Sequence, residues 1–111
     1  MKTLKALGLA IATLTAAQAS GVYAEQTLNI GFTGPLSGGA ALYGENTLSG
    51  LRMAVEDTNE AGGIKVGDDT YKVNLISLDD KYSPSQAATN AKRLVKESNA
   101  AAVFVPHTGG V

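Results

Sequence analysis

The chain has 111 residues, of which 44% are hydrophobic, and it has no cysteine. Two of its nine basic residues lie in the first 24 positions, so residues 25–111 carry seven basic against ten acidic side chains, and this net charge of −3 gives nucleic-acid binding no electrostatic support. The absence of cysteine excludes disulfides, thiolate metal sites and a lipid anchor on cysteine, and the roughly 90 residues after position 24 form one domain at most.

The first 24 residues are typical of a secretory signal peptide. Two lysines precede an uncharged stretch from Ala6 to Ala17, and small residues follow it. About a dozen residues rise only about 18 Å as a helix, against a hydrocarbon core of about 30 Å, so we expect export rather than anchoring. The predicted cleavage follows Ala24 or Ala19, and an uncleaved helix packed on the domain is the alternative.

The next residues predict a strand and then a helix. Alternating apolar side chains over residues 27–33 favour a strand that ends at the Gly34-Pro35 turn. From about Glu45 the apolar spacing changes to three and four residues, which predicts an amphipathic helix that ends at Gly62-Gly63. The face expected to be buried consists of Leu48, Leu51, Val55 and Thr58.

A hairpin or loop over residues 64–70 is expected to lead to a second strand over residues 71–78. Ser83 then has the features of a helix N-cap, with Pro84 in the first helical position and Gln86 completing a capping box. The apolar face of this second helix is predicted to contain Ala87, Ala91, Leu94, Val95 and Ser98.

A third strand is predicted from Ala101 to Val105, with the segment from His107 to Gly110 as its exit loop. The order β-α-β-α-β predicts an α/β fold with a doubly wound parallel sheet. Because three parallel strands without a final covering helix make an incomplete domain, we expect residues 25–111 to be an N-terminal fragment of one.

In such a sheet, ligands bind at the carboxyl ends of the strands. Three segments are expected to reach that edge: Gly34–Glu45, Asp79–Ser83 and Pro106–Gly110. Backbone N–H groups at a helix start suit a carboxylate ligand, because they donate hydrogen bonds at the positive end of the helix dipole.

Each of five residues near this edge has both a structural and a functional interpretation. Asp79 and Asp80 could form a metal site or an acid/base pair, but ordering of the following loop is favoured because no partner is visible in the sequence. His107 also shows no partner, which favours loop filling or ligand contact over catalysis. Tyr43 either packs or touches a ligand, and Thr108 either caps a helix or donates to a ligand.

An oxidoreductase is a weaker alternative. The segment from Thr33 to Ala40 approaches the T-G-x3-G-x-G loop of short-chain dehydrogenases, but Ala40 replaces the last glycine. No tyrosine is followed four residues later by lysine. We therefore expect no enzyme activity, no cofactor and no metal.

Several motifs together resemble the branched-chain amino-acid binding proteins of ABC importers. These motifs follow one another in order through the segment after the signal: Ile30-Gly31-Phe32-Thr33-Gly34-Pro35-Leu36-Ser37-Gly38, Tyr43-Gly44-Glu45, Asn59-Glu60-Ala61-Gly62-Gly63-Ile64, Asp79-Asp80, Pro84 and Gln86-Ala87. The resemblance implies a two-lobed periplasmic binding protein of type I, of which this chain supplies the first part of the N-terminal lobe. It also implies a periplasmic location, a small amino-acid or carboxylate ligand, and an inner-membrane ABC permease as partner.

The resemblance also implies a set of ligand contacts. The loop from His107 to Gly110 would hold the ligand's carboxylate through backbone amides and hydroxyls, with Thr108, Gly109 and Gly110 as candidates. Tyr43 would touch the ligand side chain. The family often has paired Ser or Thr residues after the third strand, whereas this chain has Thr108 followed by two glycines. Some members have a disulfide between this loop and the loop after the second strand, and the matching positions here are Tyr82 and Thr108. A ligand-sensing domain of a signalling receptor with the same fold is the alternative function.

Overall fold

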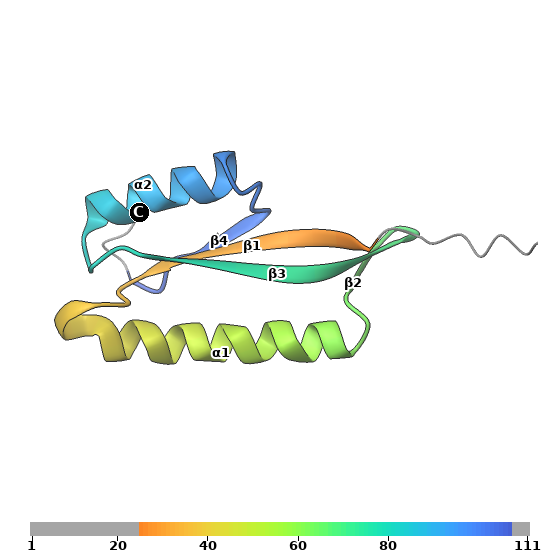
Figure 1. Cartoon of the computed structure of the whole chain (residues 1–111), viewed down its shortest axis with the longest axis horizontal. Coiled ribbons are helices and arrows are strands. Elements are labelled where there is room, and N and C mark those ends of the chain that lie inside the picture. The colour runs from red at the N-terminus through yellow and green to blue at the C-terminus, as the bar shows by residue number, and fades with distance from the viewer. Residues whose placement is uncertain (1–24, 108–111) are drawn as a thin grey trace, which may run out of the picture.

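The computed structural model describes residues 25–107, which form a four-stranded sheet with one helix on each face (Figure 1). The predicted signal peptide, residues 1–24, lies outside the described residues. Within residues 25–107, no helix has the length and apolarity that a membrane crossing needs. The elements in chain order are β1 (Gln26–Gly34), the 3₁₀ helix η1 (Gly38–Ala40), α1 (Ala41–Glu60), β2 (Ile64–Val66), β3 (Asp69–Asp79), α2 (Pro84–Lys96) and β4 (Ala102–Phe104).

The strand order is β2-β3-β1-β4, and β1 pairs in parallel with both β3 and β4. Helix α1 covers one face of the sheet and α2 covers the other, so the predicted doubly wound parallel arrangement is confirmed (Figure 1). Strand β2 pairs antiparallel with β3 at one edge of this sheet. The two strands form a hairpin, which decides between the hairpin and the loop that the sequence left as alternatives for residues 64–70. The two-residue turn of that hairpin uses the left-handed φ of +62° at Gly67.

The core lies on both faces of β1, because successive side chains of a strand point to opposite faces. Phe32 is fully buried on the side of α1, where Leu48 is also fully buried. On the other face, Gly31 leaves room for the buried side chain of Leu94 from α2, since a Cβ at this glycine would lie 2.9 Å from Leu94 Cδ1. A side chain at this glycine would therefore displace Leu94 from its buried position.

Helix α1 begins at Ala41, four residues before the predicted start. The apolar periodicity did not reveal this first turn, because it follows η1 directly and contains Gly44. Gly44 is buried against the backbone of Pro35, and a Cβ there would lie 1.7 Å from the Pro35 carbonyl oxygen. The close approach of the helix to the chain after β1 thus requires glycine.

The carboxyl end of α1 is fixed to the sheet by Asn59. Its side-chain amide donates to the carbonyl of Val73 at 2.8 Å and accepts from the N–H of Val73 at 2.7 Å. Strand β2 pairs with β3 only as far as Tyr71, so the Asn59 side chain satisfies backbone groups that no strand covers at this edge. Asn59 is the first residue of the motif from Asn59 to Ile64, and the apolar periodicity of α1 did not predict this role for it.

The start of α2 matches the prediction, with Ser83 as N-cap and Pro84 in the first turn. The Gln86 backbone N–H donates to Ser83 Oγ at 3.4 Å, but the Gln86 side chain donates to Asn90 Oδ1 at 3.0 Å, so the reciprocal half of the predicted capping box is not formed. The predicted buried face was wrong at Val95, which is 53% exposed; Asn90 is 1% exposed instead.

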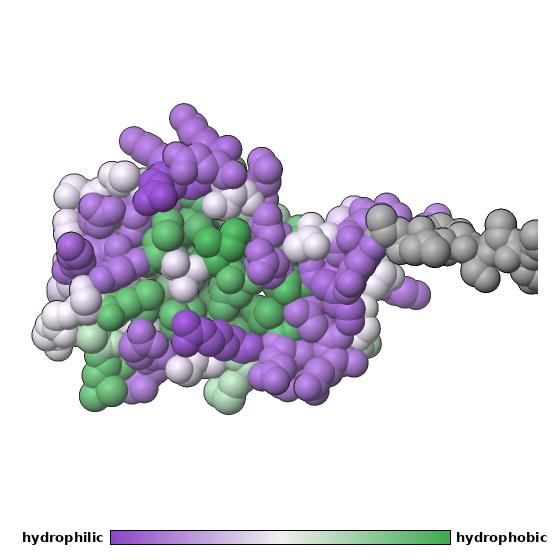
Figure 2. Space-filling model, viewed as in Figure 1, coloured by the Kyte–Doolittle hydropathy of each residue, from purple (hydrophilic) through white to green (hydrophobic). Residues whose placement is uncertain are grey.

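Apolar surface remains visible along one side of the molecule. Figure 2 shows green atoms gathered in a band between the two helices, bordered by purple polar side chains. A hollow of about 490 Å³ lies between α1 and β3 and is lined by Arg52, Val55, Glu56, Asn59, Glu60 and Leu75. Its lining residues are distinct from those at the carboxyl ends of the parallel strands.

Candidate functional site

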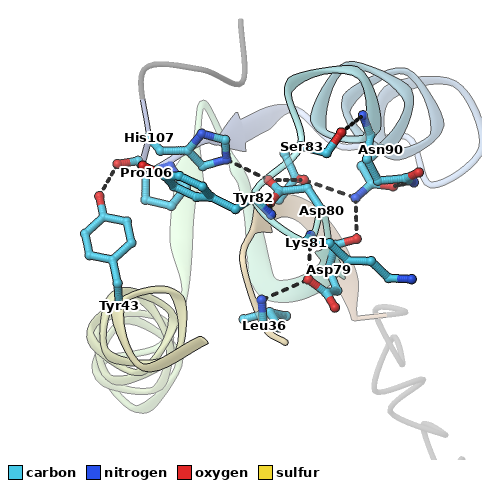
Figure 3. Close-up of polar contacts among 12 residues, drawn as sticks. Leu36, Tyr43, Asp79, Asp80, Lys81, Tyr82, Ser83, Asn90, Pro106 and His107 are labelled. Atoms are coloured by element: carbon cyan, nitrogen blue, oxygen red, sulfur yellow. Dashed lines mark hydrogen bonds and ion pairs between the residues drawn. The ribbon is translucent and has the colours of Figure 1, made fainter. Parts of the chain in front are cut away.

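The loops that follow β1, β3 and β4 meet at one edge of the sheet, as the parallel topology predicts (Figure 3). Asp80, immediately after β3, connects the other two strands: it accepts a hydrogen bond from Thr33 of β1 and contacts His107, three residues after β4. The N–H of Asp80 also donates to the Gly34 carbonyl at 3.0 Å. This edge is the candidate site.

Asp79 orders the segment that follows β1. Its Oδ1 accepts from the backbone N–H groups of Leu36 at 2.9 Å and Lys81 at 2.8 Å. Its Oδ2 accepts from the Ser37 hydroxyl. Burial raises the pKa of Asp79, but the hydrogen bond from Ser37, those from the two backbone N–H groups and the charge of Lys81 together hold this pKa below its usual value.

Asp80 orders its own loop and is completely buried. Its Oδ1 accepts from the backbone N–H of Tyr82 at 2.9 Å. Lys81 and Tyr82 have φ angles of 53° and 62°, a left-handed conformation that costs a non-glycine residue roughly 1–2 kcal/mol. The two aspartates stabilise this conformation by accepting those two N–H groups, so the structural reading of Asp79-Asp80 is confirmed.

His107 has a partner that the sequence did not reveal. Its Nε2 lies 2.9 Å from Asp80 Oδ2, and its side chain is only 6% exposed. The Tyr82 ring covers it, with ring centroids 5.0 Å apart and planes inclined by 43°. The expectation that His107 and Asp80 each lack a partner was wrong because 27 residues separate them in the chain and only the pairing of β1 with both neighbouring strands brings them together.

Tyr43 lies in the first turn of α1, where its ring is half exposed, and its hydroxyl donates to the carbonyl of Pro106 (Figure 3). The side chain therefore reaches the loop after β4 and still presents ring surface to solvent. Tyr43 and Asp80 thus contact the loop after β4 from opposite sides (Figure 3). The remaining candidates, Thr108, Gly109 and Gly110, lie outside the described residues.

Asn90 is the residue of this edge that sequence reasoning missed. From α2 its amide nitrogen donates to Thr33 Oγ1 at 3.1 Å and to the Asp79 carbonyl at 3.0 Å. The sequence did carry a signal for its burial: Asn90 lies three positions after Ala87, so it is on the same side of the helix as the predicted apolar residues. Across residues 25–107 there is no group of three or more His, Cys, Asp or Glu side chains that could hold a metal ion.

A small hollow of about 100 Å³ reaches this edge at Pro106 and is otherwise lined by Phe32, Thr47, Leu51, Phe104 and Val105. The larger hollow between α1 and β3 is lined by residues away from the candidate site. The loop edge is the better candidate, because ligands of open α/β sheets bind in the crevice outside the carboxyl ends of the strands.

The family model described as "Periplasmic binding protein" matches residues 27–111. The chain belongs to this family. The family and its fold are those of solute-binding proteins. Its fold is accordingly the β-α-β-α-β part of a periplasmic binding protein lobe, as the sequence led us to expect.

Among its relatives is the "Leu/Ile/Val-binding protein BraC3" of Rhizobium johnstonii, which is 37% identical over 109 residues, or 98% of this chain and 28% of the relative. The crystal structure of the branched-chain amino acid transporter substrate binding protein LivJ from Streptococcus pneumoniae, in complex with isoleucine, superposes with a TM-score of 0.69 at 34% identity, over 77% of this chain and 24% of LivJ. A solute binding protein from R. palustris in complex with benzoate gives a TM-score of 0.58 at 26% identity, over 76% of this chain and 22% of that protein. The chain thus spans about a quarter of the length of these relatives.

Proposed function

We propose that this chain is part of an extracytoplasmic solute-binding protein of an ABC importer. The protein captures a small amino acid of the branched-chain type, or a related carboxylate, and delivers it to a permease in the inner membrane. The observation that carries the proposal is the fixed edge at which the loops after all three parallel strands are joined through Asp80, with the exposed ring of Tyr43 beside them. The relatives named for Leu/Ile/Val and isoleucine support the ligand class.

The proposed binding mode divides the ligand between two contacts. Backbone N–H groups and the Thr108 hydroxyl hold the carboxylate, because several donors together replace the water that a carboxylate loses on binding. The ring of Tyr43 packs against the aliphatic side chain, since a tyrosine fixed at its hydroxyl end can offer its apolar face. A second lobe closes over this edge, and ligand contacts to both lobes favour the closed state. No bond is made or broken.

Isothermal titration calorimetry of the complete mature protein with leucine, isoleucine, valine and benzoate tests this proposal. We expect saturable binding of at least one of these ligands, weakened tenfold or more, about 1.4 kcal/mol, by Tyr43→Ala and by Thr108→Ala. Matched controls are Leu42→Ala, which removes a 75% exposed side chain from the same helix turn, and Thr89→Ala on the exposed surface of α2. If neither site variant differs from its control, the ligand does not bind at this edge.

The proposed localisation depends on removal of residues 1–24 as a signal peptide, with residues 25–111 belonging to the mature protein. Export across the inner membrane would place the binding edge in the periplasm, where an inner-membrane permease can meet it. Amino-terminal sequencing of the protein recovered from the periplasm tests this directly. A mature terminus at Glu25 or Ser20 agrees with the two expected cleavage positions, whereas an intact Met1 contradicts the proposal.

A further inference from the structure

The segment between β1 and α1 contains two glycines in open surroundings. Gly38 and Gly39 follow Ser37, and a Cβ added at either glycine meets nothing within 4 Å. Gly38 also has a left-handed φ of +75°, a conformation that glycine adopts without steric cost. Because glycine loses more backbone freedom on folding than any other residue, this segment needs contacts from elsewhere to keep one conformation.

The start of α1 has no local cap that could supply those contacts. Ser37 precedes η1 and Ala40 precedes α1, and neither side chain accepts a hydrogen bond from the N–H groups of the following turn. Serine is among the preferred N-cap residues, but here its hydroxyl donates to Asp79 instead. The first turn of α1 also contains no acidic residue that would stabilise it through the helix dipole. The start of this helix therefore depends on tertiary contacts.

Asp79, at the end of β3, supplies polar contacts to this segment. Its Oδ1 accepts from the Leu36 N–H at 2.9 Å, and its Oδ2 accepts from the Ser37 hydroxyl (Figure 3). The same Oδ1 accepts from the Lys81 N–H at 2.8 Å, so the carboxylate is itself held to the loop after β3. One carboxylate thus fixes two successive residues of the chain after β1.

The segment held by this carboxylate leads directly into Tyr43. Helix η1 continues into α1 without a break, and the N–H of Ala41 donates to the carbonyl of Gly38. The backbone of Pro35 also lies so close to Gly44 that no side chain fits between them. A displacement of the chain after β1 is therefore transmitted to the first turn of α1, which presents the half-exposed ring of Tyr43.

We propose that Asp79 is a positioning residue for ligand binding, which acts through Tyr43. By fixing Leu36 and Ser37 it sets where the first turn of α1 begins, and so where the ring of Tyr43 lies at the candidate site. A ring that is already in place raises affinity, because less ordering is needed on binding. This inference rests on the proposed function, in which Tyr43 contacts the ligand, but the restraint of the helix start can be measured without a ligand.

A double-mutant cycle in the complete mature protein tests this inference. Asp79→Ala removes both carboxylate oxygens, and calorimetric titration with leucine, isoleucine, valine and benzoate is expected to show about a tenfold loss of affinity. In the Tyr43→Ala background the same substitution should change affinity by less than about threefold, because the ring that Asp79 positions is absent. An equal loss in both backgrounds would mean that Asp79 does not act through Tyr43, and the inference would be overturned.

Two further variants separate positioning from stability. Asp79→Asn keeps a side-chain oxygen that can accept from Leu36 and Lys81 but loses the charge, so we expect lower stability with affinity within about threefold of wild type. Asp69→Ala removes an aspartate from the other end of the same strand, where it accepts from Gln26, and should leave affinity unchanged. If affinity instead follows the urea midpoint across all three variants, Asp79 has only a structural role.

Hydrogen exchange in the ligand-free protein measures the restraint itself. The Ala41 N–H donates to Gly38 and not to Asp79, so its exchange through local opening accelerates only if the start of α1 becomes less ordered. We expect acceleration of about tenfold in Asp79→Ala, measured relative to the N–H of Leu48 in the helix interior, which reports global unfolding. Equal acceleration at both positions, or none at Ala41, would refute the restraint.

Ser37→Ala is a milder form of the same test. It removes one hydrogen bond to Asp79 by changing an exposed side chain, so it decides the question even if Asp79→Ala does not fold. We expect about a threefold loss of affinity, with faster exchange at the Ala41 N–H. Wild-type affinity and exchange in this variant would contradict the inference.

The two proposals fail differently. If the wild-type protein binds none of the three amino acids or benzoate, the proposed function fails, and the exchange rates alone decide whether Asp79 restrains the start of α1. If wild type binds and Asp79→Ala changes neither affinity nor exchange, the positioning role is refuted while the proposed function stands.

Discussion

Two glycines of α1 provide a matched test of the packing between this helix and the chain after β1. Gly44 and Gly50 both lie inside the helix, and replacement of either by alanine raises helix propensity by about 1 kcal/mol. Their surroundings differ. A Cβ at Gly50 meets nothing within 4 Å, whereas a Cβ at Gly44 would lie 1.7 Å from the Pro35 carbonyl oxygen and 2.6 Å from its carbon.

The magnitude follows from that distance. Ordinary contacts begin at 3.4 Å, so α1 or Pro35 must move by roughly 1.7 Å to accept a methyl group at Gly44. The obstacle is backbone, which cannot rotate away as a side chain can, so the cost lies at the upper end for overpacking, about 3 kcal/mol or more. We expect Gly44→Ala to lower the free energy of unfolding by about 2 kcal/mol after the propensity gain, and Gly50→Ala to raise it by about 0.5–1 kcal/mol.

Equilibrium urea unfolding of the mature protein, followed by far-ultraviolet circular dichroism, measures both variants against wild type. The movement at Gly44 would also displace the ring of the adjacent Tyr43 from its place at the candidate site, so amino-acid affinity should fall in this variant and not in Gly50→Ala. Equal stabilisation by the two alanines would refute the close approach of α1 to Pro35. Loss of folded Gly44→Ala protein, with normal yield of Gly50→Ala, agrees with it.

Three further variants test polar contacts. Asn90→Leu should lower the free energy of unfolding by about 2–4 kcal/mol in urea titrations, because it leaves the buried Thr33 hydroxyl and the Asp79 carbonyl without their donor; a loss below about 1 kcal/mol contradicts this. The ionised carboxylate of Asp79 stabilises the folded state, because its pKa is lowered there. Asp79→Asn should therefore lower the free energy of unfolding above about pH 5, and this difference from wild type should disappear as pH falls below about 4. A wild-type advantage that is independent of pH between about 3 and 7 in urea midpoints would reject that account. Tyr43→Phe keeps the ring but not the hydroxyl bond to Pro106, so calorimetry should show affinity within about threefold of wild type, unlike Tyr43→Ala; equal losses would assign the effect to the hydroxyl.

The candidate site could be predicted from the sequence only in outline. That the loops after three parallel strands share an edge follows from the β-α-β-α-β order. One aspartate of Asp79-Asp80 was expected to order the following loop, because aspartate accepts from nearby backbone N–H groups, and in the structure both do. The contact between Asp80 and His107 could not be predicted from spacing, because it depends on how strands far apart in the chain are placed side by side.

What the sequence by itself determined is local. Alternation specified β1, a three- and four-residue period specified most of α1, and Ser83 with Pro84 specified the start of α2, because each of these signals acts over a few neighbouring residues. The same periodicity identified Leu48, Ala87 and Leu94 as buried, but only the tertiary structure decided that Asn90 is buried and Val95 is not. Asn90 is enclosed and Val95 exposed because the buried polar groups at the ends of β1 and β3 need a donor, and α2 turns the side that supplies it toward the sheet.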